Sequence, residues 1–118
     1  MDVRPIDSPP VDGYVSTFGF TPLGERWCLI DRKTALRVLQ RVLERDLAYD
    51  TPLMESARAQ LLAESFLSLF SSSARYFTNG SLESGGSGWD PITAATFDHG
   101  VVAHDDRTIG IIWVQDED

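Results

Sequence analysis

The apolar segment 109–115 near the end of the chain most constrains the fold, because it is apolar on both sides of a predicted strand. Its odd positions carry Ile109, Ile111 and Trp113, and its even positions include Ile112 and Val114. Successive side chains of a strand point to opposite faces of a sheet, so such a strand needs apolar cover on both faces. The segment therefore predicts a central strand in a layered structure.

Two helices are predicted in the middle of the chain. Asp31 is a suitable N-cap for a helix that runs to about Ala48, with leucines on one stripe. Thr51 followed by Pro52 is typical of a second helix start, and that helix is predicted to run to about Ser72. Its wide apolar face predicts burial against both the sheet and the first helix.

The remaining segments complete the predicted order. Strands are predicted at 14–20, 26–30, 92–97, 101–104 and 109–115, and a turn at 105–108 joins the last two. Three prolines predict an extended lead-in over 1–12, glycines and serines predict a flexible loop over 78–91, and residues 74–77 are predicted as a ragged continuation of the second helix. The order ββααβββ predicts a single α+β domain over 13–118, with two helices packed on an antiparallel sheet of about five strands.

Charge is unevenly distributed along the chain. The 118 residues include 18 acidic and 10 basic side chains, a net charge of −8. Residues 79–118 hold eight of the acids and one base, a net charge of −7. An acidic chain repels phosphates, which argues against direct binding of nucleic acid.

The location of the protein is predicted from its cysteine content and apolar segments. No charge-free segment is long and apolar enough to predict a membrane span, and the first residues lack the apolar core of a secretory signal. The single cysteine, Cys28, excludes an intramolecular disulfide. The sequence therefore predicts a cytoplasmic protein in a reducing compartment.

The clearest candidate for catalysis or metal binding is the pair His99 and His104 with Asp98 nearby. Positions 99 and 104 have opposite parity, so a continuous strand would place them on opposite faces unless a bulge at Gly100 intervened. The spacing matches no known metal motif. We therefore predict no cofactor and no metal, and a small enzyme using these histidines stays open as an alternative.

The last third of the chain combines a tryptophan with many carboxylates. The predicted partner-binding residues are Trp89, Asp90, Asp98, Asp105, Asp106, Asp116, Glu117 and Asp118. Tryptophan is enriched at interface hot spots, and carboxylates around it would attract a basic partner.

These features predict a non-catalytic inhibitor that neutralises a basic protein such as a toxin or a nuclease-like effector. The general character is that of bacterial immunity proteins, antitoxins and anti-CRISPR proteins, although no family motif is present. A second alternative is a structural module that forms homodimers through the wide apolar face of the second helix or an edge of the sheet.

Overall fold

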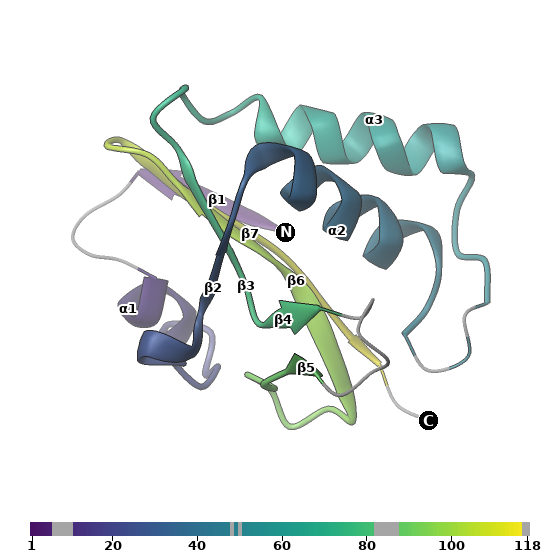
Figure 1. Ribbon diagram of the computed structural model, residues 1–118, viewed down its shortest axis with the longest axis horizontal. Coiled ribbons are helices and arrows are strands. Elements are labelled where there is room, and N and C mark those ends of the chain that lie inside the picture. Colours follow the sequence, from purple (N-terminus) through teal and green to yellow (C-terminus); the bar gives the residue numbers. More distant parts are fainter. Residues whose placement is uncertain (6–10, 48, 50, 82–87, 117–118) are drawn as a thin grey trace.

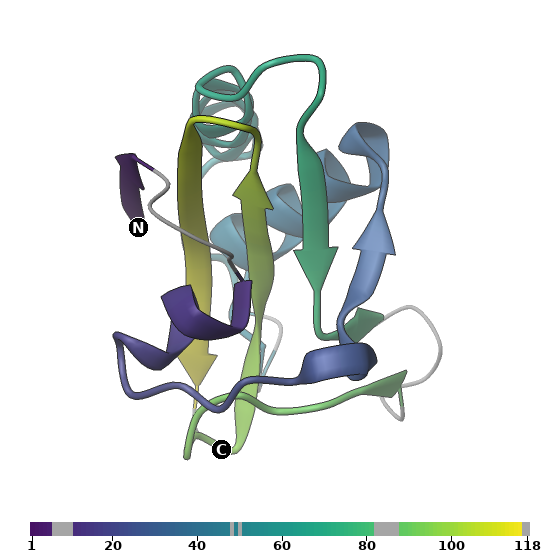
Figure 2. The ribbon, with the colours of Figure 1, turned by 90° about the vertical axis from the view of Figure 1, so that its left-hand side faces the viewer.

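The computed structural model describes residues 1–5, 11–47, 49, 51–81 and 88–116, and at its centre lies a five-stranded antiparallel sheet. Across the sheet the strands run in the order β1, β7, β6, β3 and β2 (Figure 2). Their bounds are Asp2–Pro5 for β1, Cys28–Ile30 for β2, Arg75–Thr78 for β3, Phe97–His104 for β6 and Thr108–Asp116 for β7.

Helices cover both faces of the sheet (Figure 1, Figure 2). The long helices α2 (Arg32–Glu44) and α3 (Ser56–Leu67) lie together on one face. The short α1 (Val11–Ser16) and the 3₁₀ helix η1 (Gly24–Arg26) lie on the other face. A small separate pairing joins β4 (Gly80–Ser81) to β5 (Gly88–Trp89). The antiparallel sheet with two packed helices confirms the predicted α+β class.

Strand β7 lies between β1 and β6 and is covered on both faces, as its sequence predicts. Ile109 and Ile111 pack with Val102 in the core beneath α1. Ile112 points the other way and packs with Phe66 in the core between the sheet and the two long helices. Because β7 has apolar side chains on both faces of the sheet, helices have to cover each face.

Both long helices form, but each is shorter than predicted: α2 ends at Glu44 rather than at about Ala48, and α3 begins later than predicted and ends at Leu67 rather than at about Ser72. Asp31 Oδ1 accepts a hydrogen bond at 2.8 Å from the backbone N–H three residues on, which caps α2 as predicted. Thr51 and Pro52 do not open α3. Pro52 instead forms an isolated antiparallel bridge with Arg45, so the chain first pairs with the end of α2. Tertiary pairing therefore displaces the helix start by a few residues.

The predicted strand at 14–20 is wrong, because the chain there forms α1 and a tight turn. Tyr14 and Phe18 are four residues apart, a spacing that fits a helical turn as well as one face of a strand. Their rings meet edge to face, with centroids 5.3 Å apart. Asp12 ties α1 to η1 and β2 by accepting a hydrogen bond from Trp27 Nε1 at 2.7 Å.

Two predictions in the second half of the chain are also wrong. Residues 74–77, expected as a ragged helix end, mostly belong to β3, which is paired on both sides by β2 and β6. Residues 92–97 were expected as a strand, but the chain bends through them until β6 begins at the last one. The backbone N–H groups of Ile92 and Thr93 donate to the Asp98 side chain, which replaces the strand ladder there.

Both segments that were expected to be irregular contain short strands. Within the predicted lead-in 1–12, β1 pairs with β7, with Asp2 opposite Ile111. The Tyr14 hydroxyl donates to the Asp2 carboxylate at 2.5 Å and links α1 to this edge of the sheet. Of the predicted loop 78–91, residues 82–87 lie outside the described residues, and its ends form β4 and β5.

Gly100 in β6 generates a prediction about stability. A Cβ atom at this position would overlap the carbonyl oxygen of Ile112 and lie 2.9 Å from the ring of Trp113. We expect Gly100→Ala to lower the free energy of unfolding by roughly 2 to 4 kcal/mol, because β6 and β7 would have to move apart. Denaturation in urea measures this change.

The matched control is Gly13→Ala in α1, where a Cβ atom meets nothing within 4 Å. The free energy of unfolding should stay unchanged or rise by up to about 1 kcal/mol, because alanine favours a helix more than glycine does. Equal stability of the two variants would contradict the close approach at Gly100.

Candidate functional site

Asp98, at the start of β6, is a fully buried carboxylate that serves the fold. Its oxygens accept hydrogen bonds from five donors at 2.8 to 3.2 Å, namely the backbone N–H groups of Ile92 and Thr93, the Thr93 hydroxyl, Asn79 Nδ2 and Trp113 Nε1. These donors come from the loop before β6, from the residue after β3 and from β7. A carboxylate so completely engaged joins three parts of the protein and is inaccessible to a partner.

Asn79 connects this carboxylate to His99. Asn79 Nδ2 donates to Asp98 Oδ1 at 3.0 Å and to the backbone oxygen of Asp90 at 2.8 Å. The other end of the amide, Asn79 Oδ1, lies 2.7 Å from His99 Nδ1, so this nitrogen carries the proton of the neutral ring. Burial lowers the pKa of His99 to about 4, and the ring is therefore neutral near pH 7.

Asp105 is also largely buried, in the turn between β6 and β7. Its carboxylate accepts hydrogen bonds from the backbone N–H groups of Ser71 at 2.7 Å, Arg107 at 2.8 Å and Thr108 at 2.7 Å. Burial raises the pKa of Asp105, but these hydrogen bonds outweigh it and hold the pKa below its ordinary value. Asp105 thus closes the turn and attaches it to the segment after α3.

The other predicted binding residues are dispersed. Asp90 is half-buried, and its Oδ1 lies 3.5 Å from Arg26 Nη1. Asp116 accepts a hydrogen bond from the backbone N–H of Leu47 at 3.0 Å, whereas Asp106 is exposed. The side chain of Trp89 and the residues Glu117 and Asp118 lie outside the described part of the chain. The described carboxylates therefore do not gather into one acidic surface.

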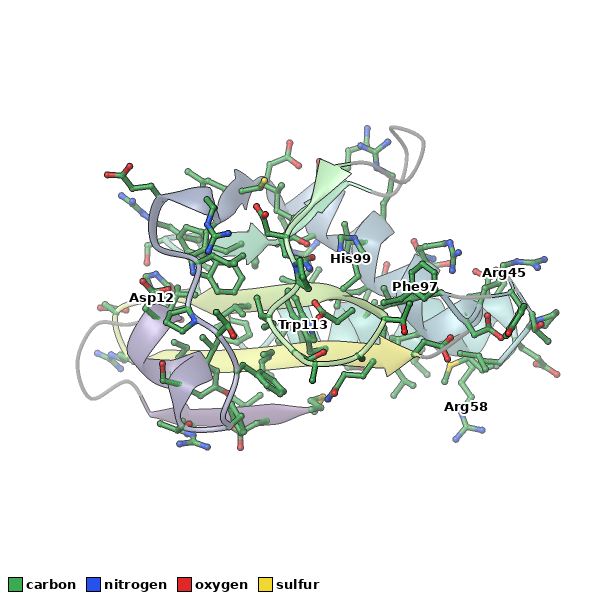
Figure 3. All side chains as sticks on the ribbon, turned by 90° about the horizontal axis from the view of Figure 1, so that it is seen from below. Asp12, Arg45, Arg58, Phe97, His99 and Trp113 are labelled. Atoms are coloured by element: carbon green, nitrogen blue, oxygen red, sulfur yellow. The ribbon has the colours of Figure 1, made fainter. Side chains whose placement is uncertain are left out.

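The two histidines do not meet. Strand β6 pairs with β7 without interruption from Phe97 to His104, so no bulge at Gly100 changes the alternation of its side chains. His99 lies on the face of α2 and α3, near the labelled Phe97 end of the strand (Figure 3). His104 lies on the opposite face and stacks on Phe77, with ring centroids 5.7 Å apart. Among the described residues, no three histidine, cysteine or acidic side chains are placed to hold a metal ion.

Exposed leucines lie on one side of α3 and in the turn just after it. Leu61, Leu62 and Leu69 are 64%, 41% and 51% exposed, and we call these three residues the α3 surface. Arg58 lies one helical turn before Leu62 and points away from the body of the protein (Figure 3). The helix packs against both the sheet and α2 as predicted, but Leu61 and Leu62 of its wide apolar face remain exposed.

The opposite side of α3 supplies the buried contacts. It packs against α2 and the sheet through Ala59, Ala63, Phe66 and Leu67. These positions make one buried stripe at helical spacing, whereas Leu61 and Leu62 fall outside it. The apolar residues of this helix exceed one stripe in the sequence, and that excess is the signal that could have located the exposed leucines.

A shallow groove extends from the α3 surface toward the β6–β7 turn. It has a volume of about 560 Å³ and is lined by residues 68–71, 73 and 105–108. Leu69 and the exposed Asp106 both line it. The arrangement offers apolar contact beside a carboxylate, which suits the binding of another macromolecule.

Comparisons with family models, curated proteins and solved structures gave no significant match to this chain. None of the described helices has the length and apolar character needed to cross a membrane.

Replacing the buried carboxylate should destabilise the protein. In Asp98→Asn, an amide NH₂ group would face donors that now meet a carboxylate oxygen. We expect the free energy of unfolding to fall by about 2 to 4 kcal/mol, since buried donors would lose a charged acceptor. Asp106→Asn is the control, and it should change this energy by less than about 0.5 kcal/mol because Asp106 is exposed. Equal losses would contradict the role of Asp98.

The buried histidine predicts a pH dependence of stability. The pKa of His99 is about 4 in the folded protein, below its ordinary value of 6.5. Between these values the unfolded chain binds more protons, so the free energy of unfolding falls as the pH drops from 6.5 toward 4. The expected contribution of His99 is about 2 to 3 kcal/mol across this window. NMR of the ring tests it directly, and titration near pH 6.5 in the folded protein would contradict it.

Proposed function

We propose that the protein is a small non-catalytic binding protein of the inhibitor or immunity type, which holds a basic protein partner on the α3 surface. The supporting observation is that Leu61 and Leu62 are 64% and 41% exposed on α3, which buries its opposite side, and that Leu69, in the turn just after this helix, is 51% exposed. Exposed leucines that gather on one side of a helix are typical of a protein-protein interface. Occlusion of the partner's substrate cleft would then inhibit a toxin or a nuclease-like effector.

The charge of the chain supports a basic partner. The net charge of −8 creates a negative field that speeds encounter with positive proteins and disfavours acidic ones. At short range, the exposed Asp106 offers an acceptor for a lysine or an arginine, in a groove that Leu69 and Arg107 also line. This proposal assigns long-range attraction to the net charge and close contact to the α3 surface.

The same leucines favour a second candidate, a homo-oligomeric module in which the α3 surface contacts another copy of the chain. Two copies of a chain with a net charge of −8 repel each other, which favours a different, basic protein as the partner.

The test compares the wild-type protein with L61Q/L69Q. The partner is recovered with the tagged wild-type protein from its own host, purified, and measured for binding and for inhibition of its activity. We expect the variant to bind at least tenfold more weakly, because apolar contacts at the centre of an interface dominate its affinity. The association rate of the wild-type protein should fall as salt increases.

Leu29→Gln is the matched control, because Leu29 is 62% exposed but lies on β2. It should bind the partner as the wild-type protein does, and all variants should keep their stability within about 0.5 kcal/mol. Equal affinity of L61Q/L69Q, or an association rate insensitive to salt, would overturn the proposal. A sedimentation mass of two chains that returns to one in L61Q/L69Q would instead support the homo-oligomer.

A further inference from the structure

A second groove, with a volume of about 810 Å³, lies where the end of β2, the start of α2 and the segment that connects α3 to β3 come together (Figure 1). Ile30 and Tyr76 line it and lie opposite each other in the register of β2 and β3. Both belong to the core between the sheet and the two long helices, so the groove opens on that face of the sheet. Phe70 and Ala74 complete its apolar lining. Its volume falls within the roughly 300 to 1,000 Å³ of sites that bind small molecules.

The hydroxyl of Tyr76 is a polar group in this groove that has no partner. The Tyr76 side chain is 6% exposed, and no described residue forms a hydrogen bond with its hydroxyl. Among the described residues, every side-chain nitrogen or oxygen that is fully enclosed has a hydrogen-bond partner, so this hydroxyl must reach solvent. Because Tyr76 lines the groove, we assign that access to the groove. The hydroxyl can therefore donate a hydrogen bond to a molecule bound there.

The neighbouring polar side chains are already engaged or point elsewhere. Ser71 Oγ lies 2.8 Å from Ser73 Oγ, and Asp31 Oδ1 accepts the hydrogen bond that caps α2. Arg75 borders the groove, but successive residues of a strand alternate, so its side chain lies on the face opposite to that of Tyr76. Tyr76 is thus the hydrogen-bonding group that the groove offers at depth.

The charges at the rim select against a charged ligand. Asp31 and Arg32 both line the groove and are both exposed, and they bring one charge of each sign. An anion would meet Asp31 and the net charge of −8, whereas a cation would meet Arg32. The apolar lining offers no counter-charge to a buried ionic group, which would be costly to desolvate there. The groove therefore favours an uncharged molecule.

From the apolar lining, the unpartnered hydroxyl and the balanced rim, we propose that this groove binds an uncharged aromatic small molecule that carries a carbonyl group. The aromatic body would pack against Phe70 and Ile30, and the Tyr76 hydroxyl would donate to the carbonyl oxygen. This site is separate from the α3 surface and does not rest on the proposed function.

The first measurement tests whether the Tyr76 hydroxyl has no partner in the protein. Tyr76→Phe should unfold at the same urea concentration as the wild-type protein, because it loses no hydrogen bond. Tyr14→Phe is the matched control, since Tyr14 is also 6% exposed but its hydroxyl donates to the Asp2 carboxylate. The control should unfold at a lower urea concentration. An equal loss in the two variants would refute the proposal.

The second measurement follows the binding of two probes of the same shape by fluorine NMR. The ketone is para-fluoroacetophenone, and the hydrocarbon is para-fluoro-α-methylstyrene, in which a CH₂ group replaces the carbonyl oxygen. We expect saturable binding of the ketone. Tyr76→Phe should weaken the ketone about three- to tenfold, the worth of one hydrogen bond, and leave the affinity of the hydrocarbon unchanged. Ala74→Phe, which fills part of the groove, should weaken both probes.

Other variants separate this site from the rest of the protein. Tyr49→Phe removes an exposed hydroxyl outside the groove and should bind the ketone as the wild-type protein does. L61Q/L69Q should also bind it unchanged, so this proposal and the proposed function can fail separately. No saturable binding at millimolar ketone, equal ketone affinity of Tyr76→Phe and the wild-type protein, or tighter binding of the hydrocarbon to the wild-type protein would each overturn the assignment.

Discussion

The arrangement of the second half of the chain depends on the buried carboxylate of Asp98. An ionised group without partners is costly to bury, so its five donors have to be in place together. They include the backbone of the loop before β6, Asn79 after β3 and Trp113 on β7. The Asp98 side chain thus connects the start of β6 with the bent loop before it, with the end of β3 and with β7.

Burial of carboxylates such as Asp98 limits how the acidic last third of the chain can contact a partner. Asp98 and Asp105 are buried acceptors of backbone hydrogen bonds, and Asp116 accepts one from Leu47. Their charges still contribute to the long-range field, but their oxygens already have partners. Close contact with a partner therefore falls to exposed groups such as the leucines of α3 and Asp106. Long-range attraction and close contact are therefore supplied by different residues. A count of acidic residues in the sequence does not separate the two.

The sequence pattern correctly predicted the elements that depend on interactions between residues close in the chain, such as helix capping and apolar periodicity. The cap at Asp31 and the leucine stripe after it predict α2, and the parity of 109–115 predicts a central strand with cover on both faces. The prediction is wrong for residues 14–20, because aromatic residues four apart fit either a strand or a helical turn. It is wrong for 92–97, because Asp98 takes the backbone N–H groups that a neighbouring strand would need.

The sequence by itself determined the α+β class, the two long helices and the need for a sheet covered on both faces. These follow from periodicity and capping, which act between residues close in the chain. Only the tertiary structure decided that Asp98 is buried, that His99 and His104 face apart, and that Leu61 and Leu69 remain exposed. Such outcomes depend on which distant segments pack together, because burial is a property of the assembled layers.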